Sequence, residues 1–377
     1  MKELEAIVTA AEQARASNQT AALATVVGIE GSAYRLPGAR MLIVNGRWLA
    51  GSISGGCLED DVVLRAQEAI SRNEALVTTY DTTSDDDIVF GVGLGCKGVI
   101  TILIEPIPKE VHEADFIAFA KSCLQTRATG IVATVIRVEG QVSAQPGSRM
   151  LLRDGSVVAD WKDDDLTSKV TRESEALSAE TSRLVNITLP AGSAQVFIER
   201  IAPPVPLVIF GAGHDAMPVV RLAKALGWHV TLIDHRPAYG NATRFPDADR
   251  IIVCQPPEVS RHVEFSHETL ALVMTHNYLR DRDLLEILLP TAVRYIGLLG
   301  PRKRTDQLLA DLQDKGLQPS ADQLERLYAP VGLDIGSESP TEVALSILSE
   351  MQAVMTHHRG HHLRERKRPI HQAESIV

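Results

Sequence analysis

The stretch LVIFGAGHDAMPVVRLAKALGWHVTLID, residues 207–234, decides the fold of the second half of this 377-residue chain. It predicts a buried strand, a glycine-rich turn, a helix that ends at Gly227 and a second strand that ends at Asp234. A strand that runs through G-x-G-x-x-A into a helix, and on to a strand ending in an acid, is the dinucleotide-binding fingerprint in its structural context. The stretch therefore indicates a Rossmann-like domain.

The same alternation of strands and helices continues towards the end of the chain. Further apolar strands are expected at 250–254, 270–276 and 295–300, with a helix near 281–289 and a long final helix at 341–355. Such alternation favours a parallel sheet with helices on both faces. We expect this α/β domain to span residues 207–356.

The N-terminal half contains a divergent internal duplication. ATVVGIEGSAYRLPGARMLIVNG (24–46) aligns without gaps to ATVIRVEGQVSAQPGSRMLLRDG (133–155), and 11 of the 23 positions are identical. Both copies end in a two-residue hairpin signal, Asn-Gly or Asp-Gly, and both continue into a helical stretch and an apolar strand. We therefore expect residues 1–202 to form one α/β domain of two repeats, at about 20–107 and 130–201.

A proline-rich linker, residues 203–206, separates the two expected domains. The chain ends in a basic, histidine-rich tail, residues 357–377, for which we expect disorder. Binding of a metal or of an acidic partner is the alternative for this tail.

The composition argues against several classes of protein. Hydrophobic residues make up 45% and charged residues 23%, as in folded globular chains, and the net charge of −10 argues against a nucleic-acid partner. We expect no membrane span, because no run of about 18 apolar residues occurs, and the charged N-terminal helix is unlike a signal peptide. The four cysteines form no CxxC pair, which favours free thiols in the cytoplasm.

The glycine-rich turn supplies the first candidate site. Gly211 permits a tight turn and Gly213 permits the backbone to approach a phosphate, beside the helix start at His214. Asp234 follows Gly213 by 21 residues, where a ribose hydroxyl would be held. These residues predict a dinucleotide site, and a scaffold for another phosphate-bearing ligand is the alternative.

The segment MTHNYLRD, residues 274–281, supplies a second set. His276 and Asn277 fall at the carboxyl end of an expected parallel strand, which is the edge where ligands bind in such sheets. His276 suits an acid, a base or a ligand. A hydrogen-bonded structural histidine is the alternative.

Two cysteines lie among glycines. Cys57 stands in SISGGCLED, directly after Gly55 and Gly56, where a loop becomes a helix, and Cys96 stands in GLGCKG beside Lys97. A helix start or a neighbouring cation favours a thiolate, whereas the acids after Cys57 oppose it. We interpret both thiols as ligand-binding candidates, and small inert core residues are the alternative. The other two cysteines, Cys123 and Cys254, are interpreted as structural.

The segment GSAYRLPGAR, residues 31–40, contains two arginines. Arg40 recurs as Arg149 in the second copy, so we interpret Arg40 as structural. Arg35 does not recur and is the candidate for a bidentate phosphate contact, with a solvated loop charge as the alternative.

Together these motifs resemble the XdhC/CoxI family, accessory proteins of xanthine dehydrogenase and related molybdenum hydroxylases. The resemblance covers nearly the whole chain. It rests on GSAYRLPGARMLI, GSISGGCLE, GLGCKGVITILIEP, VIFGAGHDAMPVV, VMTHNYLRD and YIGLLGPRKR. Tyr34 and Lys97 depart from the family pattern, which usually has Pro and Gly at these positions.

The resemblance implies a chaperone that binds molybdenum cofactor (molybdopterin), supports its sulfuration by a cysteine desulfurase and inserts it into the hydroxylase. The absence of iron–sulfur cysteine sets agrees with an accessory role. Because molybdenum is thiophilic, Cys57 and Cys96 are the candidate metal ligands, with Gly55, Gly56 and Arg35 beside the cofactor. The implied setting is purine catabolism in the cytoplasm, and a homodimer is left open.

Two other functions remain open. The main alternative is an NAD(P)-dependent oxidoreductase that uses His276 as its acid or base, which predicts a change in nicotinamide absorbance with a small substrate. The other is a thiol redox sensor, which predicts a reversible disulfide between Cys57 and Cys96.

Overall fold

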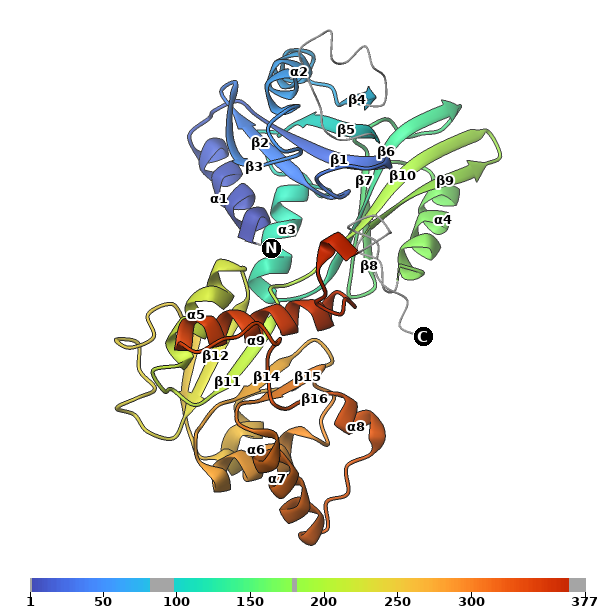
Figure 1. Ribbon diagram of the computed structural model, residues 1–377. Coiled ribbons are helices and arrows are strands. Elements are labelled where there is room, and N and C mark those ends of the chain that lie inside the picture. Colours follow the sequence, from blue (N-terminus) through green and yellow to red (C-terminus); the bar gives the residue numbers. More distant parts are fainter. Residues whose placement is uncertain (1, 82–97, 178–181, 366–377) are drawn as a thin grey trace. The chain divides into compact units, whose positions relative to one another are not determined.

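The computed structural model describes residues 2–81, 98–177 and 182–365 (Figure 1). The chain divides into two compact units, Met1–Pro203 and Pro204–Val377. The division falls within the proline-rich segment, and each unit has its own sheets and its own core. Within the described ranges, no helix is long and apolar enough to cross a membrane.

The first repeat forms a five-stranded antiparallel sheet with the order β3-β2-β1-β5-β4. Its elements are α1 (Lys2–Ala16), β1 (Ala21–Gly31), β2 (Arg40–Val44), β3 (Arg47–Gly51), α2 (Glu59–Arg72), β4 (Leu76–Asp81) and β5 (Gly98–Pro106). Buried apolar residues of α2 pack on this sheet, whereas α1 packs with α3 of the second repeat in a separate cluster.

The second repeat forms another five-stranded antiparallel sheet, with the order β8-β7-β6-β10-β9. Its elements are α3 (Phe116–Thr126), β6 (Gly130–Gly140), β7 (Arg149–Arg153), β8 (Ser156–Ala159), α4 (Asp164–Glu175), β9 (Ser182–Leu189) and β10 (Gly192–Ile201). The element order and the strand order match those of the first repeat one for one. The predicted internal duplication is therefore confirmed as two copies of one structural unit.

Both predicted hairpin turns have the backbone conformation that their residues favour. Asn45 and Gly46 have φ of 50° and 70°, and Asp154 and Gly155 have φ of 51° and 78°. Positive φ at both central residues defines the type I′ turn, which matches the twist of the flanking strands. The turns therefore start both hairpins in the same register, which a bulge in the first copy shifts between Leu42 and Ile43.

Two buried arginines at equivalent positions join the repeats. Arg40 of the first repeat pairs with Glu199 of the second, and Arg149 of the second pairs with Glu105 of the first at 2.6 Å. Both guanidinium groups lie over the Phe116 ring, with their central carbons 4.4 and 5.5 Å from its centroid. The predicted structural role of Arg40 is confirmed.

The C-terminal unit contains a six-stranded parallel sheet with the order β13-β12-β11-β14-β15-β16. Its strands are β11 (Pro206–Phe210), β12 (His229–Asp234), β13 (Arg250–Val253), β14 (Leu270–Val273), β15 (Tyr295–Leu298) and β16 (Leu327–Tyr328). Its helical elements are α5 (Ala216–Ala225), η2 (Pro256–Arg261), α6 (Tyr278–Leu288), α7 (Arg302–Asp314), α8 (Ala321–Glu325), α9 (Pro340–Met355) and η3 (Leu363–Glu365). The expected Rossmann-like domain is confirmed, and its strand order reverses between β11 and β14.

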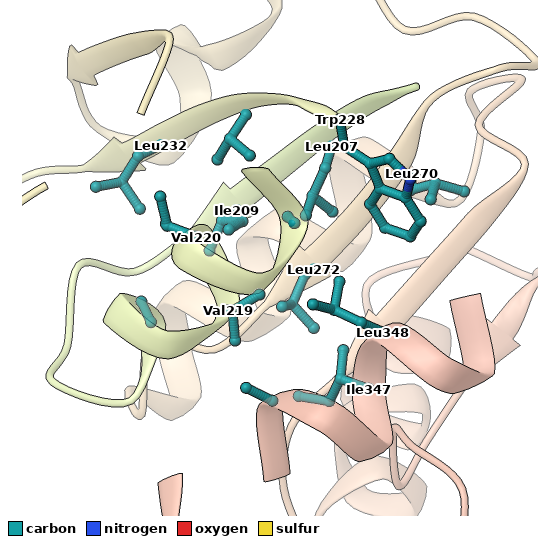
Figure 2. Close-up of a cluster of buried hydrophobic side chains, with 14 of the residues drawn as sticks. Leu207, Ile209, Val219, Val220, Trp228, Leu232, Leu270, Leu272, Ile347 and Leu348 are labelled. Atoms are coloured by element: carbon teal, nitrogen blue, oxygen red, sulfur yellow. The ribbon is translucent and has the colours of Figure 1, made fainter. Parts of the chain in front are cut away.

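The central strand β11 buries both of its faces. Leu207 and Ile209 pack with α5 and α9 in the cluster that Figure 2 shows, whereas Val208 and Phe210 pack with α6 and α7 on the other face. Alternate residues of a strand point to opposite faces, so one short apolar run fills two cores. The layers are helix, sheet and helix, as the alternation predicted.

Three predicted strands are longer than the observed ones, β13 by a single residue, since it ends at Val253 and a strand was expected up to 254. β14 ends at Val273, although a strand was expected up to 276, and β15 ends at Leu298, although a strand was expected up to 300. The extra residues continue past the sheet as loops at its carboxyl edge. This edge contains the candidate residues of the C-terminal unit.

The crossed ion pairs generate a stability prediction. Replacing Arg149 by Met keeps the aliphatic stem but leaves the mostly buried Glu105 without its cation, so we expect a loss of about 3 kcal/mol in the free energy of unfolding. Urea unfolding of the full chain, followed by circular dichroism, measures this loss. Arg137→Met is the matched control, because Arg137 and its partner Glu139 are both exposed, and such pairs contribute about 0–1 kcal/mol. Equal losses in the two variants would contradict the prediction.

Candidate functional site

The glycine-rich turn of the C-terminal unit passes close to the end of β14. Gly211 has φ of 112°, and a Cβ at this position would lie 2.5 Å from the carbonyl oxygen of Met274. Only glycine avoids this clash. At Gly213, a Cβ would lie 2.3 Å from a carboxylate oxygen of Asp215. His214, the neighbouring candidate, is exposed.

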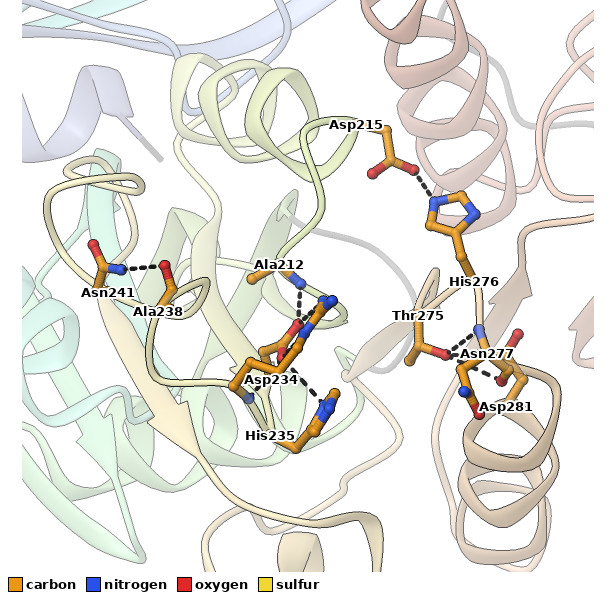
Figure 3. A network of polar contacts seen from close by, with 11 residues as sticks. Ala212, Asp215, Asp234, His235, Ala238, Asn241, Thr275, His276, Asn277 and Asp281 are labelled. Carbon is orange, nitrogen blue, oxygen red and sulfur yellow. Dashed lines mark hydrogen bonds and ion pairs between the residues drawn. The ribbon is translucent and has the colours of Figure 1, made fainter.

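Asp234 lies at the end of β12, with a side chain that is only 2% exposed (Figure 3). Its carboxylate accepts hydrogen bonds from the Ala212 N–H at 2.7 Å and from the Arg236 N–H at 2.8 Å, and it pairs with the Arg236 guanidinium at 2.9 Å. Burial alone would raise the pKa of Asp234, but the Arg236 side chain and these N–H groups lower it below the ordinary value. Both carboxylate oxygens therefore have partners within the protein.

His276 and Asp215 form a pair across the point where the strand order reverses. The distance between His276 Nε2 and an Asp215 carboxylate oxygen is 2.6 Å (Figure 3). Asp215 follows β11 and His276 follows β14, which are the two neighbouring strands at this point. His276 has φ of 56°, an uncommon conformation for a residue other than glycine, and its side chain is 59% exposed. The pair is therefore open to a ligand.

Asn277 has a capping role in the structure. Its side chain accepts a hydrogen bond from the Arg280 N–H at 3.1 Å, which satisfies one of the free donors at the start of α6. Beside it, the Thr275 hydroxyl donates to the buried carboxylate of Asp281 at 2.5 Å. These contacts account for Asn277 without a ligand.

A small pocket lies at the carboxyl ends of β11, β12, β13 and β14. Polar and sulfur-bearing side chains in its lining are Asp234, His235, Arg236, Cys254, Thr275 and Arg280. Its cavity volume of about 20 Å³ is roughly that of one water molecule. Burial, followed by the charge of Glu258, raises the pKa of the Cys254 thiol, so this cysteine faces the pocket as a neutral thiol.

In the N-terminal unit, Cys57 lies exposed in the loop before α2. The Ser54 oxygen accepts the N–H groups of Gly56, Cys57 and Leu58 at 3.2, 3.1 and 3.2 Å, and the Cys57 thiol lies 3.4 Å from it. The Ser54 hydroxyl in turn donates to the buried carboxylate of Glu59. One hydroxyl therefore fixes the loop and leaves the thiol exposed to solvent.

Glu3 of α1 connects this loop to the other candidate segment. One carboxylate oxygen of Glu3 accepts the Ser52 N–H at 2.8 Å, and the other accepts the Arg35 guanidinium at 2.5 Å. The Tyr34 ring lies beside Gly55, since a Cβ on Gly55 would be 3.8 Å from it. The structure therefore brings Arg35 and the Cys57 loop together, with Arg35 already paired.

The other predicted metal ligand, Cys96, lies outside the described residues, as does the rest of its segment up to Lys97. Within the three described ranges, no group of three or more His, Cys, Asp or Glu side chains is arranged to hold a metal ion. Of the two remaining cysteines, Cys123 is buried in the core beside α1, whereas Cys254 lines the pocket described above.

Sequence reasoning missed Glu3, Asp215, Arg236 and Arg280. Glu3 stands in an expected amphipathic helix, where an acid is ordinary. Asp215 and Arg236 each lie within two residues of a candidate residue, and that proximity was the only signal available for them. Arg280 lies in the quoted segment MTHNYLRD, but where its side chain points depends on the orientation of α6, which begins at Tyr278.

Comparison with known proteins gives consistent matches to both units. The family described as the XdhC Rossmann domain matches residues 207–351, and the XdhC and CoxI family matches residues 14–81. A probable xanthine dehydrogenase subunit of Bacillus subtilis is 33% identical over 88% of this chain and 92% of its own length. The molybdenum cofactor insertion chaperone PaoD of Escherichia coli is 22% identical over 93% of this chain and 88% of its own length.

A solved structure is similar over both units. A crystal structure described as a xanthine dehydrogenase from Bacillus halodurans superposes with a TM-score of 0.75 at 29% identity. The match covers 93% of this chain and 96% of that one. The similarity therefore extends to nearly the whole of both chains.

The contacts of Asp234 generate a prediction with a defined pH dependence. Asp234→Asn removes the ion pair with Arg236, and we expect a loss of about 1–3 kcal/mol in the free energy of unfolding at pH 7. Because the folded-state pKa is lowered, the stabilisation is complete above the unfolded pKa of about 3.9 and is lost as the pH falls through the folded value. The difference between wild type and variant should therefore shrink below about pH 4.

Urea unfolding at several pH values between 7 and 3.5 measures this difference. Asp247→Asn, which replaces an exposed acid of the same unit, is the control and should change stability little at any of these pH values. A loss for Asp234→Asn that stayed constant with pH would show that the ionised carboxylate is not what stabilises the turn.

Proposed function

The chain belongs to the XdhC and CoxI family, and from this membership we propose that it is an accessory protein of xanthine dehydrogenase or a related molybdenum hydroxylase. Two family matches and a relative with 33% identity over most of both chains support this assignment. A more distant relative, similar over 93% of the chain, is a molybdenum cofactor insertion chaperone. We propose the same cargo, molybdenum cofactor, for this protein.

The observation that carries the proposal is the exposed thiol of Cys57. Sulfur ligands suit soft, thiophilic metals, and this thiol lies in the loop before α2, which Ser54 holds in place. Gly55 and Gly56 are exposed and have no side chains that would cover the approach to the thiol. The donor set therefore fits a molybdenum centre that is held transiently through sulfur.

Arg35 is the candidate for the phosphate of the cofactor. Its guanidinium pairs with Glu3, and its side chain is 28% exposed. A phosphate would have to exchange with the Glu3 carboxylate, and this exchange would also free the Glu3 side chain beside Ser52. Release of the cargo would restore both contacts with Glu3.

The remaining parts of the proposal follow from the family. Cys96 is the second candidate ligand, a cysteine desulfurase is the expected partner for sulfuration, and the cytoplasm is the expected compartment. We also propose a dinucleotide as the ligand of the Rossmann-like unit, on the basis of Gly211, Gly213 and the pocket beside them.

Pterin retention tests the chaperone function. Protein purified from cells that make molybdenum cofactor is denatured and oxidised, and the released pterin is measured by its fluorescence. We expect pterin near one per chain in the wild type, and a loss of about tenfold in Cys57→Ala or Cys96→Ala if each thiol contributes a metal bond worth about 1.4 kcal/mol. Cys123→Ala is the control, because this thiol is buried and cannot reach a ligand.

Unchanged pterin in both single variants would contradict the role of the thiols. No pterin in the wild type, even after incubation with freshly released cofactor, would contradict the chaperone function itself. Melting curves of all variants separate a loss of ligand from a loss of fold.

One observation favours a second function, an NAD(P)-dependent oxidoreductase. The exposed pair of His276 and Asp215 lies at the switch point of the sheet, where an acid or base would face a bound nicotinamide. This function predicts a change in nicotinamide absorbance with a small substrate, and its loss in His276→Asn. Pterin retention without such turnover would favour the chaperone.

A further inference from the structure

The acid of the dinucleotide fingerprint is not available to a ribose. Asp234 is buried, and its carboxylate holds the Ala212 N–H of the glycine-rich turn on one side and Arg236 on the other. Opening these contacts would leave a buried carboxylate without donors, which is costly. The group that meets a ligand at the end of β12 is therefore the guanidinium of Arg236, whose side chain is 38% exposed.

The loop after β12 contains further positive charge. Arg236 lies over the Tyr239 ring at 3.9 Å from its centroid, and Arg244 lies over the same ring at 4.6 Å. One terminal nitrogen of Arg244 is buried and has no hydrogen-bond partner among the described residues. Arg236 and Arg244 are thus held beside the Tyr239 ring, and one terminal nitrogen of Arg244 remains a donor without an acceptor among the described residues.

Arg280 adds a second cation to the lining of the same pocket. It lies in the first turn of α6, where its backbone N–H donates to Asn277, and no hydrogen bond or ion pair of its guanidinium is found in the described part of the chain. Burial, and next the charge of Arg280, lower the pKa of His235, which lines the pocket as well. The lining therefore carries one carboxylate that Arg236 neutralises and the additional cation Arg280, and this net positive charge suits an anion.

The rest of the pocket is apolar. Phe210, Ile233, Pro256, Val259 and Leu284 contribute to its lining, next to the close backbone turn at Gly211. A cavity of about 20 Å³ does not enclose a nucleobase, so a base would lie across the apolar opening of the pocket, with its phosphates at the glycine-rich turn. The cationic side of the pocket then lies where the sugar next to that base would be.

We propose that the Rossmann-like unit takes an adenine dinucleotide phosphorylated on its adenosine ribose, and that Arg236 and Arg280 bind this phosphate. The inference rests on the dinucleotide proposed above and names its chemical class. Arg236 keeps its pair with Asp234 through Nε and one terminal nitrogen, and its other terminal nitrogen, for which no partner is found among the described residues, is the donor left for the phosphate. Arg280 gains the anionic partner that it lacks among the described side chains.

Calorimetric titration of the full chain tests the proposal. NADPH and NADH differ by one ribose phosphate, as do adenosine 2′,5′-bisphosphate and 5′-AMP, and all four are titrated at one fixed ionic strength. Two charge-assisted contacts predict that each phosphorylated probe binds at least about tenfold more tightly than its counterpart. In Arg280→Gln this ratio should fall towards one, because the affinity for NADPH falls by a larger factor than the affinity for NADH.

Arg236→Gln should have the same effect, but it also removes the partner of Asp234 and is checked by its melting curve. Arg280→Gln breaks no ion pair of the described residues and keeps the test decisive if Arg236→Gln is unstable. Arg250→Gln is the matched control, because Arg250 lies at the opposite, amino end of β13. This control should leave the ratio at its wild-type value.

Each other outcome overturns a different claim. Equal affinities, or tighter binding of NADH, would overturn the phosphate site and leave the dinucleotide in place. Binding of none of the four probes would overturn the dinucleotide as well. Pterin retention by the Cys57 loop would be untouched by either result, because it is measured separately.

Discussion

Two ion pairs that cross between the repeats are the constraint on which the N-terminal unit depends. Arg40 and Arg149 each pair with a glutamate of the other repeat, and both stack on one phenylalanine ring. Buried charges of this kind specify a single arrangement, because any other docking of the repeats would leave them unpaired in an apolar core. The repeats are thus joined by position-specific contacts as well as by apolar packing.

The two repeats differ directly after the hairpin that begins with Arg40 in the first copy and with Arg149 in the second. In the second repeat, Asp160 lies directly after β8, and its carboxylate accepts a hydrogen bond from the Arg149 N–H. In the first repeat, Gly51 occupies the paired position of Ala159, one residue before Asp160, and a Cβ on Gly51 would lie 2.2 Å from the carbonyl oxygen of Arg40. The chain therefore passes directly over Arg40 and continues into the loop of Cys57. A shared arginine supports a loop that only one repeat has.

Much of the fold follows from local pattern. Identity between the two copies predicted the duplication, and the recurrence of Arg40 as Arg149 predicted a structural role that the burial of both confirms. Strand and helix alternation predicted the parallel sheet. The ends of β14 and β15 were placed too late, because apolar residues continue into the loops at the carboxyl edge.

Contacts between distant residues could not be predicted in this way. Arg35 was identified as a candidate for a phosphate contact, yet its guanidinium pairs with Glu3, which is 32 residues away in an ordinary amphipathic helix. Asp234 was identified by its distance in sequence from Gly213, yet its carboxylate binds the Ala212 N–H of the same glycine-rich turn. A pattern gives the residue type and the edge on which it lies, whereas tertiary packing decides which partner it meets.

The switch point of the parallel sheet shows why its parts have to be considered together. The clash that only Gly211 avoids brings the turn after β11 against the end of β14. That approach places Asp215 within 2.6 Å of His276, whose left-handed backbone costs roughly 1 kcal/mol. The pair with Asp215 offsets part of this cost and fixes the direction of the imidazole. Gly211, Asp215 and His276 thus form one connected site, although the first and the last are 65 residues apart in the sequence. The site lies at the edge where ligands of such sheets bind.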